Sequence, residues 1–229
     1  MYFSLISPTV GAERDAAQQR LDGPYADHQW LWNWFPSEND TRRDFLFRRR
    51  EVDGLPRYYV VSSRAPVKAA DSWHMQSRDY APELAIGDQL QFELRANPTV
   101  RHGHDGKSKR HDVVMNAKKK LLAERGLTRW ADWEGADRPS FDAVALPPCT
   151  AWLQRRGEAL GFAPDLSTLT IEGQEQCRDQ SRQDLRFTSV DLTGLITVTD
   201  PGAFRTALMS GVGSAKAFGC GLMLVKRPG

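Results

Sequence analysis

Short strand-like segments joined by tight turns constrain this chain most, because strands separated by only a few residues pair in antiparallel sheets. Residues 44–50 (DFLFRRR) and 56–62 (PRYYVVS) flank Asp53-Gly54, a dipeptide that favours a hairpin turn. Residues 88–96 (DQLQFELRA) alternate apolar and polar side chains, as a half-buried strand does. Mixed with helical segments, these strands predict an α+β fold and argue against a doubly wound parallel sheet.

Prolines and glycines mark where the helices begin and end. Pro24 and Pro201 suit the first turn of a helix, and Gly126 and Gly161 suit the position just after the last turn. We expect helices at residues 12–21, 24–34, 113–125, 150–160 and 202–209. We expect further strands at residues 1–6, 166–175, 185–192, 195–199 and 222–226, with a turn at Thr193-Gly194 and connecting loops at 97–106 and 131–148.

The length of 229 residues leaves room for one or two domains. In the first half, a strand, a helix, two strands and a further strand follow one another, which is close to a ferredoxin-like unit. We therefore predict an α+β protein with antiparallel sheets, made of two ferredoxin-like (RRM-like) domains in tandem at residues 1–97 and 98–229.

Composition excludes several classes of protein. Hydrophobic residues make up 40% and charged residues 26%, which is typical of a globular domain. No run of about 18 apolar residues is present, so no membrane helix is expected, and the N-terminus does not resemble a signal peptide. The widely spaced Cys149, Cys177 and Cys220 predict thiols in a reducing cytoplasm rather than disulfides or a zinc site.

Tyr25 and His28 are the first candidates for chemistry. Three residues apart on a helix, they share one face, with Cβ atoms about 5–6 Å apart. A phenol beside an imidazole can act as a general acid/base pair, because histidine titrates near neutral pH. The alternative is a histidine that only packs among the aromatic residues around it.

Residues 211–221 (GVGSAKAFGCG) form a glycine-rich segment between a predicted helix and the last strand. Backbone N–H groups in such a loop can approach a phosphate, and Lys216 adds positive charge, so Gly211, Gly213, Ser214 and Lys216 are candidate phosphate-binding residues. The spacing fits neither a Walker A loop nor a dinucleotide-binding fingerprint. The alternative is a turn that only links the helix to the strand.

The net charge is only +2, but the charges are clustered. Residues 42–50 hold five Arg against one Asp, and residues 101–120 hold seven Lys or Arg against two Asp. Such stripes can follow a nucleic-acid backbone, although a solvated charged face is the alternative. The candidate RNA-binding residues here are Arg42, Arg43, Lys107, Lys109 and Arg110. The same cations disfavour a metal site at His102, His104 and His111.

Three arginines lie in a segment between two strand-like stretches, residues 177–186 (CRDQSRQDLR). A hairpin that presents Arg178, Arg182 and Arg186 could enter an RNA groove or hold phosphates. Because Asp179 and Asp184 lie among them, a salt-bridged surface hairpin is the alternative.

Several motifs in order resemble one family over nearly the whole chain. They are GPYADHQWLWNWF, RRDFLFRRRE, RYYVVSSRAP, LQFELRANPTV, GKSKRHDVV and, at the end, LTGLITVTDPGAF followed by GVGSAKAFGCGLMLV. This pattern resembles the RAMP-type CRISPR endoribonucleases, and more narrowly the CasE family, the repeat-processing subunit of the type I-E Cascade complex.

The resemblance implies two tandem ferredoxin-like domains and cleavage of CRISPR repeat RNA at the 3′ base of a stem-loop, with neither metal nor cofactor. Tyr25 and His28 match the family's residues at the cut, and residues 211–221 match its glycine loop. The strands around Arg178 and Arg186 resemble the hairpin that grips the stem. The implied partners are the other Cascade subunits, especially the backbone subunit. No binding to a membrane is expected.

The chemistry expected of such a protein is attack of a ribose 2′-OH on the adjacent phosphorus, which leaves a 2′,3′-cyclic phosphate and a 5′-OH. His28 would transfer protons, most simply to the 5′-oxygen, and Tyr25 would orient or activate the 2′-OH. Two rival interpretations stay open: a non-catalytic RNA-binding RAMP subunit, and a small-molecule enzyme on a ferredoxin-like scaffold.

Overall fold

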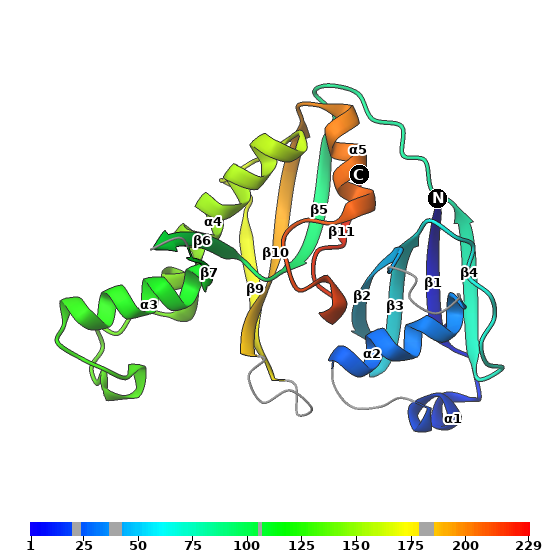
Figure 1. Ribbon diagram of the computed structural model, residues 1–229, viewed down its shortest axis with the longest axis horizontal. Coiled ribbons are helices and arrows are strands. Elements are labelled where there is room, and N and C mark those ends of the chain that lie inside the picture. Colours follow the sequence, from blue (N-terminus) through cyan, green and yellow to red (C-terminus); the bar gives the residue numbers. More distant parts are fainter. Residues whose placement is uncertain (20–23, 37–42, 105–106, 179–185) are drawn as a thin grey trace.

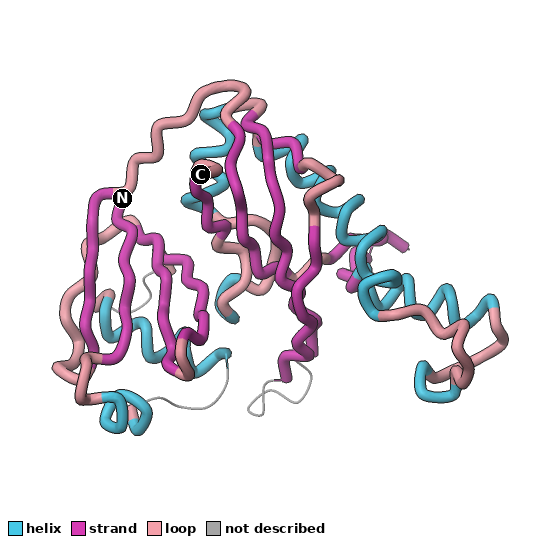
Figure 2. The backbone as a smooth tube through the Cα atoms, turned by 180° about the vertical axis from the view of Figure 1, so that it is seen from behind, coloured by secondary structure: helices cyan, strands magenta, loops and turns pink. Residues whose placement is uncertain are grey.

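Two antiparallel sheets, one from each half of the chain, form the framework of the computed structural model (Figure 1). The structure describes residues 1–19, 24–36, 43–104, 107–178 and 186–229. Seen from behind, the strands of both sheets lie in front of most of the helices, so each unit has a sheet layer and a helix layer (Figure 2). The α+β prediction is confirmed.

The first sheet has the strand order β2-β3-β1-β4 and is antiparallel throughout. Its strands are β1 (Tyr2–Pro8), β2 (Phe45–Val52), β3 (Leu55–Ser62) and β4 (Trp73–Asp79), with the helices α1 (Glu13–Gln18), α2 (Pro24–Leu31) and the 3-10 turn η1 (Trp32–Trp34). Asp53 and Gly54 join β2 to β3 with φ values of 55° and 75°, as the hairpin prediction requires. The strand β4 was not expected from the sequence.

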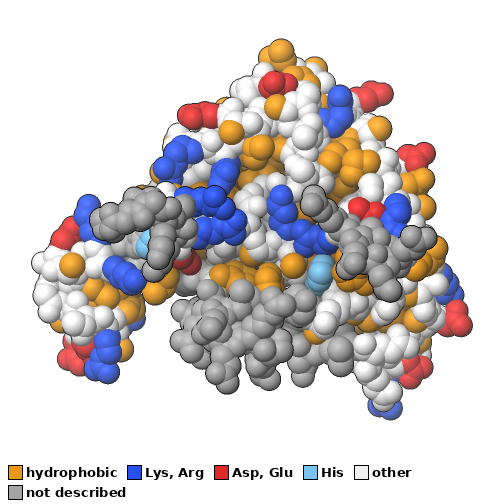
Figure 3. Space-filling view, viewed as in Figure 1, with side chains coloured by type: hydrophobic (Ala, Val, Ile, Leu, Met, Phe, Trp, Pro, Cys, Tyr) orange, Lys and Arg blue, Asp and Glu red, His pale blue; other side chains and the backbone are white. Residues whose placement is uncertain are grey.

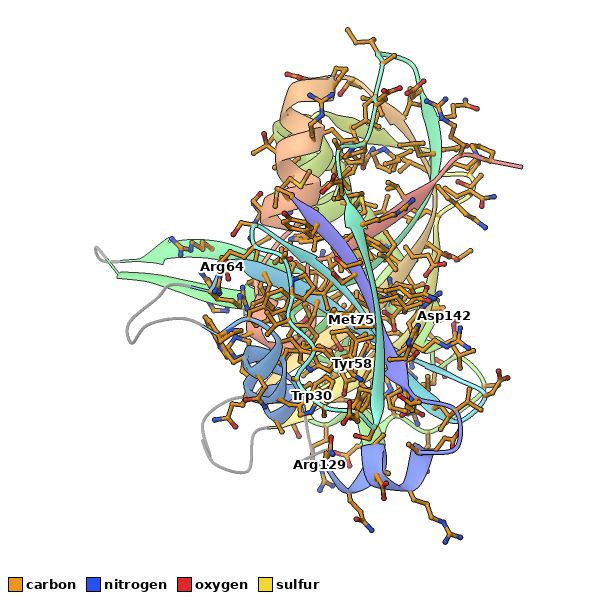
Figure 4. The ribbon with its side chains drawn as sticks, turned by 90° about the vertical axis from the view of Figure 1, so that its right-hand side faces the viewer. Trp30, Tyr58, Arg64, Met75, Arg129 and Asp142 are labelled. Atoms are coloured by element: carbon orange, nitrogen blue, oxygen red, sulfur yellow. The ribbon has the colours of Figure 1, made fainter. Side chains whose placement is uncertain are left out.

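Aromatic side chains hold α2 against this sheet. The ring of Trp30 lies 5.0 Å from that of Tyr58 and 4.5 Å from that of Trp73, measured between centroids. Met75 packs against the same cluster, and Figure 4 shows Trp30, Tyr58 and Met75 gathered between the helix and the strands. Burial of several large rings supplies most of the driving force for this contact.

The second sheet has the strand order β11-β5-β10-β8, with β9 also paired to β10. Its strands are β5 (Gln89–Ala96), β8 (Phe162–Pro164), β9 (Thr170–Arg178), β10 (Arg186–Val198) and β11 (Met223–Lys226). The other elements of this half are the hairpin β6 (Thr99–His104) and β7 (Lys107–Asp112), the helices α3 (Val113–Glu124), α4 (Phe141–Leu160) and α5 (Pro201–Ser210), and the turns η2 (Trp130–Asp132) and η3 (Lys216–Phe218).

Helix caps in this half follow the sequence rules. The carboxylate of Asp112 accepts hydrogen bonds from the N–H groups of Val114 and Met115 at the start of α3. Asp200 does the same at the start of α5, where Pro201 takes the first helical position, as predicted. Gly161 ends α4 with a φ of 79°, also as predicted.

No helix in the described part of the chain is long and apolar enough to cross a membrane.

Both sheets have the ferredoxin-like strand order, in which the first and third strands lie in the centre. In the first unit these are β1 and β3, and in the second unit they are β5 and β10. The first unit lacks the second helix of the motif, since residues 63–72, all of them described, connect β3 to β4 without one. The prediction of two tandem ferredoxin-like units is confirmed.

The strand β5 belongs to the second unit, although the sequence led us to place it in a first domain of residues 1–97. It pairs with β10 and β11 of the second sheet and, within the described residues, with no strand of the first. The sheets therefore divide between β4 and β5, and we propose the segment of residues 80–88 as the boundary between domains of residues 1–79 and 89–229.

Three local predictions were wrong. The turn at Thr193-Gly194 does not exist, because β10 continues through it and pairs with β5 from residue 190 to 197. Most of the loop expected at 97–106 is the strand β6, which pairs with β7, and these polar strands lack the apolar alternation that marks a strand. The helix expected at 150–160 begins at Phe141, because Val144 and Ala145 are buried in the core despite Pro147 and Pro148.

The two sheets meet through the faces that the helices leave uncovered. Leu46 and Val61 of the first sheet pack with Leu222 of the second unit. Beside them lies a group of charged side chains that we call the interface cluster: Arg48, Arg50, Glu93, Arg95 and Asp191. The guanidinium of Arg48 lies 3.3 Å from Asp191 Oδ1, Arg95 lies 2.8 Å from Asp191 Oδ2, and Arg50 pairs with Glu93.

Candidate functional site

His28 lies on α2 at the edge of the first unit that faces the second. Its ring is half-buried and lies 6.5 Å from the ring of Phe47 in a stacked arrangement, with Phe45 and Trp32 at 5.7 and 6.1 Å. Burial, and after it the positive charge of Arg43, lower the pKa of His28 to about 4. The imidazole is therefore neutral at physiological pH.

The residue before His28 fixes the orientation of α2. Asp27 is buried, and its carboxylate accepts a hydrogen bond of 2.6 Å from the hydroxyl of Tyr58 and lies 3.6 Å from the guanidinium of Arg49. A buried carboxylate held by β2 and β3 prevents the helix from rotating, because rotation would leave the charge without partners. Tyr25 lies one turn earlier in α2, and its side chain is outside the described part of the structure.

The glycine-rich loop at residues 211–221 belongs to the second unit and packs against the first. Gly211, Gly213, Gly219 and Gly221 have φ values of 81°, 85°, 75° and 93°, which favour glycine over any other residue. A Cβ on Gly211 would lie 2.9 Å from Leu46, and one on Gly219 would lie 3.2 Å from Phe47. The loop therefore packs closely on β2, and its η3 turn contacts α2.

Polar contacts hold this loop in place. The hydroxyl of Ser214 donates to Oδ1 of Asn97 at 2.9 Å, and the Asn97 amide donates to the carbonyl of Thr188 at 2.8 Å. Asn97 is 5% exposed, so this pair of bonds is protected from water. Within the loop, the Val212 N–H donates to the Gly221 carbonyl at 2.8 Å. Ser214, predicted as a phosphate ligand, thus has a structural partner in the protein.

A basic cavity of about 640 Å³ opens beside the loop, within the second unit. Its walls are the β6–β7 hairpin, the C-terminal part of α4 and the glycine-rich loop. Five cationic side chains line it: Arg101, Arg110, Arg155, Arg156 and Lys216. Among the described residues of its lining there is no Asp or Glu, so its charge is suited to an anion.

Positive charge connects this cavity to His28. The pKa of Lys216 is lowered by burial and, after it, by the charges of Arg43 and Arg156. The charge of Arg43 also lowers the pKa of His28. Cations from the segment before β2, from the loop and from α4 are therefore close enough to interact electrostatically. The ammonium of Lys216 donates to the Ser210 carbonyl at 2.5 Å. Figure 3 shows Lys and Arg side chains gathered in a band across the middle of this face.

The structure brings together some of the predicted RNA-binding residues. Gly211, Gly213, Ser214, Lys216 and Arg110 all line the basic cavity, and Arg43 lies within electrostatic reach of it. Residues 211–221 also contact the first unit, which a turn that only links a helix to a strand does not require, and their binding of RNA stays a prediction.

The other predicted arginines and lysines are placed in part. Lys107 and Lys109 belong to β7, and Arg178 and Arg186 lie opposite each other at the end of the β9–β10 pair, as a hairpin requires. The side chains of these four residues, and all of Arg42 and Arg182, are outside the described residues. The hairpin geometry agrees with the prediction, and its contact with RNA stays a prediction.

The interpretation of residues 42–50 as a basic stripe that follows a nucleic-acid backbone was too broad. Arg48 is 4% exposed and belongs to the interface cluster, and Arg50 pairs with Glu93. Arg49 pairs with Asp27 and Glu51. Of the described arginines in this stretch, only Arg43 contributes its charge to the candidate site.

Arg155 and Arg156 were missed. They lie at the end of α4, four residues after Ala151 and Trp152, and the Arg156 guanidinium lies 5.8 Å from the Trp152 ring centroid. Two adjacent arginines in the last turns of a helix, with a tryptophan one turn earlier, are the sequence signal that could have indicated them. Stacking on a buried ring orients Arg156 at the cavity wall.

Comparisons with known proteins agree with this geometry. The profile of a family described as "CRISPR associated protein" matches residues 1–227. "CRISPR system Cascade subunit CasE" of Escherichia coli (strain K12) is 27% identical over 87% of this chain and 89% of that protein. "CRISPR-associated endoribonuclease Cse3" of Thermus thermophilus is 27% identical over 92% of this chain and 93% of that protein.

A solved structure described as "CRISPR endoribonuclease Cse3 bound to 19 nt RNA" is similar in fold. It has a TM-score of 0.67 and 23% sequence identity, and the match covers 98% of each chain. This similarity supports the arrangement of two ferredoxin-like units. Since the family profile spans nearly the entire sequence, the chain belongs to the CRISPR-associated protein family, and its curated relatives place it with the CasE-type members that it resembles.

Proposed function

We propose that this protein is a metal-independent endoribonuclease that cuts CRISPR precursor RNA at the base of the repeat stem-loop and then remains with the product as a Cascade subunit. The relatives named as a Cascade subunit and as an endoribonuclease support this proposal, because they align over nearly the whole chain. We place the protein in the cytoplasm with its RNA and the other Cascade subunits, especially the backbone subunit, as partners.

The observation that carries the proposal is a neutral imidazole beside a surface of positive charge. The imidazole of His28 is neutral at physiological pH, since its pKa is lowered to about 4, and the neutral imidazole is the form that can accept a proton. The charge of Arg43 lowers the pKa of both His28 and Lys216, so cations that can bind a phosphodiester act on the surroundings of the imidazole. A proton acceptor next to phosphate-binding cations is the arrangement that RNA transesterification requires.

The reaction balances with one histidine. The 2′-oxygen gives its proton to His28, attacks the phosphorus and forms the 2′,3′-cyclic phosphate, while the bond from phosphorus to the 5′-oxygen breaks. The departing 5′-oxygen needs one proton, and His28 can return the one that it accepted. The negative phosphate favours the intermediate imidazolium, because an opposite charge raises the pKa of a histidine.

The other residues hold the substrate in this scheme. Lys216 and the backbone N–H groups of the glycine-rich loop bind the non-bridging phosphate oxygens, where charge develops during the reaction. Tyr25 orients or activates the 2′-OH, and the β9–β10 hairpin around Arg178, Arg182 and Arg186 grips the stem. The scheme needs neither a cofactor nor a metal ion.

The test is cleavage of a repeat stem-loop RNA by the wild type, by His28→Ala and by the control variant His74→Ala, whose histidine is exposed on β4. We expect His28→Ala to lose about 10²–10⁴-fold in single-turnover rate and to keep its RNA affinity. His74→Ala should cut normally and EDTA should have no effect. Binding without cutting by the wild type would instead indicate a non-catalytic RNA-binding subunit, and loss of activity in EDTA would exclude the metal-free scheme.

A further inference from the structure

The basic cavity lies beside the surroundings of His28 but is lined by other residues. Every described residue that lines it belongs to the second unit, whereas α2 belongs to the first. The glycine-rich loop lies between them, with Lys216 facing the cavity and the η3 turn in contact with α2. An RNA strand that passes Lys216 therefore has a second place to bind, beyond the cut itself.

The charges in this cavity lack carboxylate partners among the described residues. Arg155 donates from Nε to the backbone carbonyl of Ala151 at 3.2 Å, and Lys216 donates to that of Ser210. These bonds orient the side chains but leave their charge in place. Both arginines of α4 are exposed, and so are Arg101 and Arg110 on the hairpin. These four arginines and Lys216, held around one hollow, repel one another unless an anion lies between them.

The size and lining of the cavity indicate which part of an RNA it accepts. At about 640 Å³ it lies within the range of small-ligand pockets, so it can hold a nucleotide or two but not a duplex. Its tryptophan, Trp152, is 2% exposed and offers no surface on which a base could stack. Arginine side chains and hydroxyl groups without a stacking platform bind the backbone rather than the bases.

The cavity and the stem-gripping hairpin lie on different sides of the glycine-rich loop. Figure 1 shows the paired ends of β9 and β10 below this loop and the β6–β7 hairpin to its left. Both strands of a stem separate at its base, so a stem held at the hairpin leaves an unpaired strand available to a second binding place such as the cavity.

We propose that the basic cavity binds the phosphate backbone of the single-stranded RNA that leaves the base of the stem, with Arg155 and Arg156 as its main contacts. This inference rests on the proposed function for the identity of the RNA. The strand on either side of the stem has the same chemistry, so the experiment has to distinguish the 5′ flank from the 3′ flank.

The test compares four RNAs with a 2′-deoxy residue at the cleavage position, so that they bind without being cut: the stem-loop with both flanks, without the 5′ flank, without the 3′ flank, and without either. The proteins are the wild type, the double variant Arg155→Ala/Arg156→Ala, and the control Arg205→Ala/Arg227→Ala, which removes two exposed arginines of the same unit away from the cavity. The dissociation constants come from fluorescence anisotropy over a range of salt concentrations.

We expect the wild type to lose at least about tenfold in affinity when one of the two flanks is removed. The double variant should bind the full RNA with an affinity lower than that of the wild type by a similar factor. Removal of that flank should not lower the affinity of the double variant further, because the contact with the flank is already lost. The slope of log affinity against log salt should become less steep by about 0.7 for each lost contact to single-stranded phosphate. The control should behave as the wild type.

Two results would overturn this inference. An equal loss of affinity by the double variant on all four RNAs would mean that the cavity contacts the stem, and no loss on any would mean that it does not contact RNA. Cleavage of the natural RNA by the wild type is measured separately. If the wild type binds with the expected flank dependence but never cuts, the proposed function fails while the cavity assignment stands.

Discussion

Two groups of arginines in this protein have opposite environments. In the interface cluster, Arg48, Arg50 and Arg95 are matched by Glu93 and Asp191 between the two sheets. In the basic cavity, by contrast, the described lining holds five cations and no carboxylate. The first group joins the two units and the second is available to an anion. Pairing, more than the number of arginines, separates a structural cluster from a binding site.

Strand register produces this difference. Asp191 of β10 lies directly opposite Arg95 of β5, so the sheet itself places the acid beside the base. Arg48 then reaches the same carboxylate from β2 of the other unit. The cavity arginines come from the end of a helix and from a separate hairpin, where no described strand register brings an acidic residue opposite them. Each prediction below changes one side of this comparison.

The largest effect is expected from Asp191→Ala. This change leaves the guanidinium of Arg48, whose side chain is 5% exposed, with only Glu93 at 3.9 Å among its described acidic partners. Breaking a buried ion pair on one side costs about 3–5 kcal/mol, and we expect the lower end of that range in urea unfolding. Asp71→Ala is the control, because the carboxylate of Asp71 is fully exposed beside Lys68 and its loss should not move the midpoint. An unchanged midpoint for Asp191→Ala would show that the interface cluster does not join the units.

A smaller effect is expected from Gly211→Ala, which moves the wall of the cavity. The backbone at this residue has φ 81° and ψ 153°, a conformation that costs about 1–3 kcal/mol for other residues, and the new Cβ would meet Leu46. We expect a loss of stability together with slower RNA cleavage. Gly87→Ala is the matched control, with φ +87° and open space around the new Cβ. Equal loss of cleavage by both variants would contradict a role of the loop in the site.

A still smaller change in stability is expected from Arg155→Ala. The side chain is exposed and makes no ion pair with a described carboxylate, so the free energy of unfolding should stay within about 0.5 kcal/mol of the wild type. Arg48→Ala, the counterpart in the interface cluster, should be far less stable in the same urea experiment. The distinction between the two clusters fails if both variants lose similar stability.

The smallest effect is the response of His28 to pH. Its neutral form is the reactive one in the proposed scheme, and this form is lost only as pH falls through about 4. The value of kcat/KM should therefore stay nearly constant from about pH 7 to about 5.5. A rate that rises steadily as pH falls over this range would mean that the imidazolium is the reactive form.

The same lowered pKa affects stability, so unfolding has to be monitored in this experiment. The unfolded chain binds a proton near pH 6.5 and the folded chain only near 4, so the contribution of His28 is present above about 6.5 and lost as pH falls through about 4. Arg43→Gln should raise the pKa of His28 in an NMR titration, because it removes a like charge. Arg50→Gln, in the interface cluster, should leave this pKa unchanged.

The sequence was most informative where local chemistry decides structure. The Asp53-Gly54 turn, the Asp200-Pro201 helix start and the apolar alternation of β5 all predicted elements that the structure contains. It was misleading where tertiary pairing decides. The partner of β5, and the continuation of β10 through Gly194, depend on strands that are distant in sequence. For the same reason, the five arginines at residues 42–50 could not be divided into paired and unpaired ones.

The candidate site was predicted in part. His28 and the glycine-rich loop were identified from residue type and spacing, and the structure brings η3 into contact with α2. Nothing in the sequence indicates that Asp27 fixes this helix through Tyr58, because 31 positions separate the two. Nor does it indicate that Arg155 and Arg156 lie beside Arg101 and Arg110, since a helix and a hairpin meet there only in the folded chain.

The close packing of the glycine-rich loop on β2 has a consequence for synthesis of the protein. His28 is translated well before Lys216 and the loop that contacts α2. A nascent chain that has already folded its first unit therefore contains the histidine without the phosphate-binding half of the site. If the proposed function holds, such a chain cannot damage cellular RNA, and nuclease activity begins only when the second unit closes against the first.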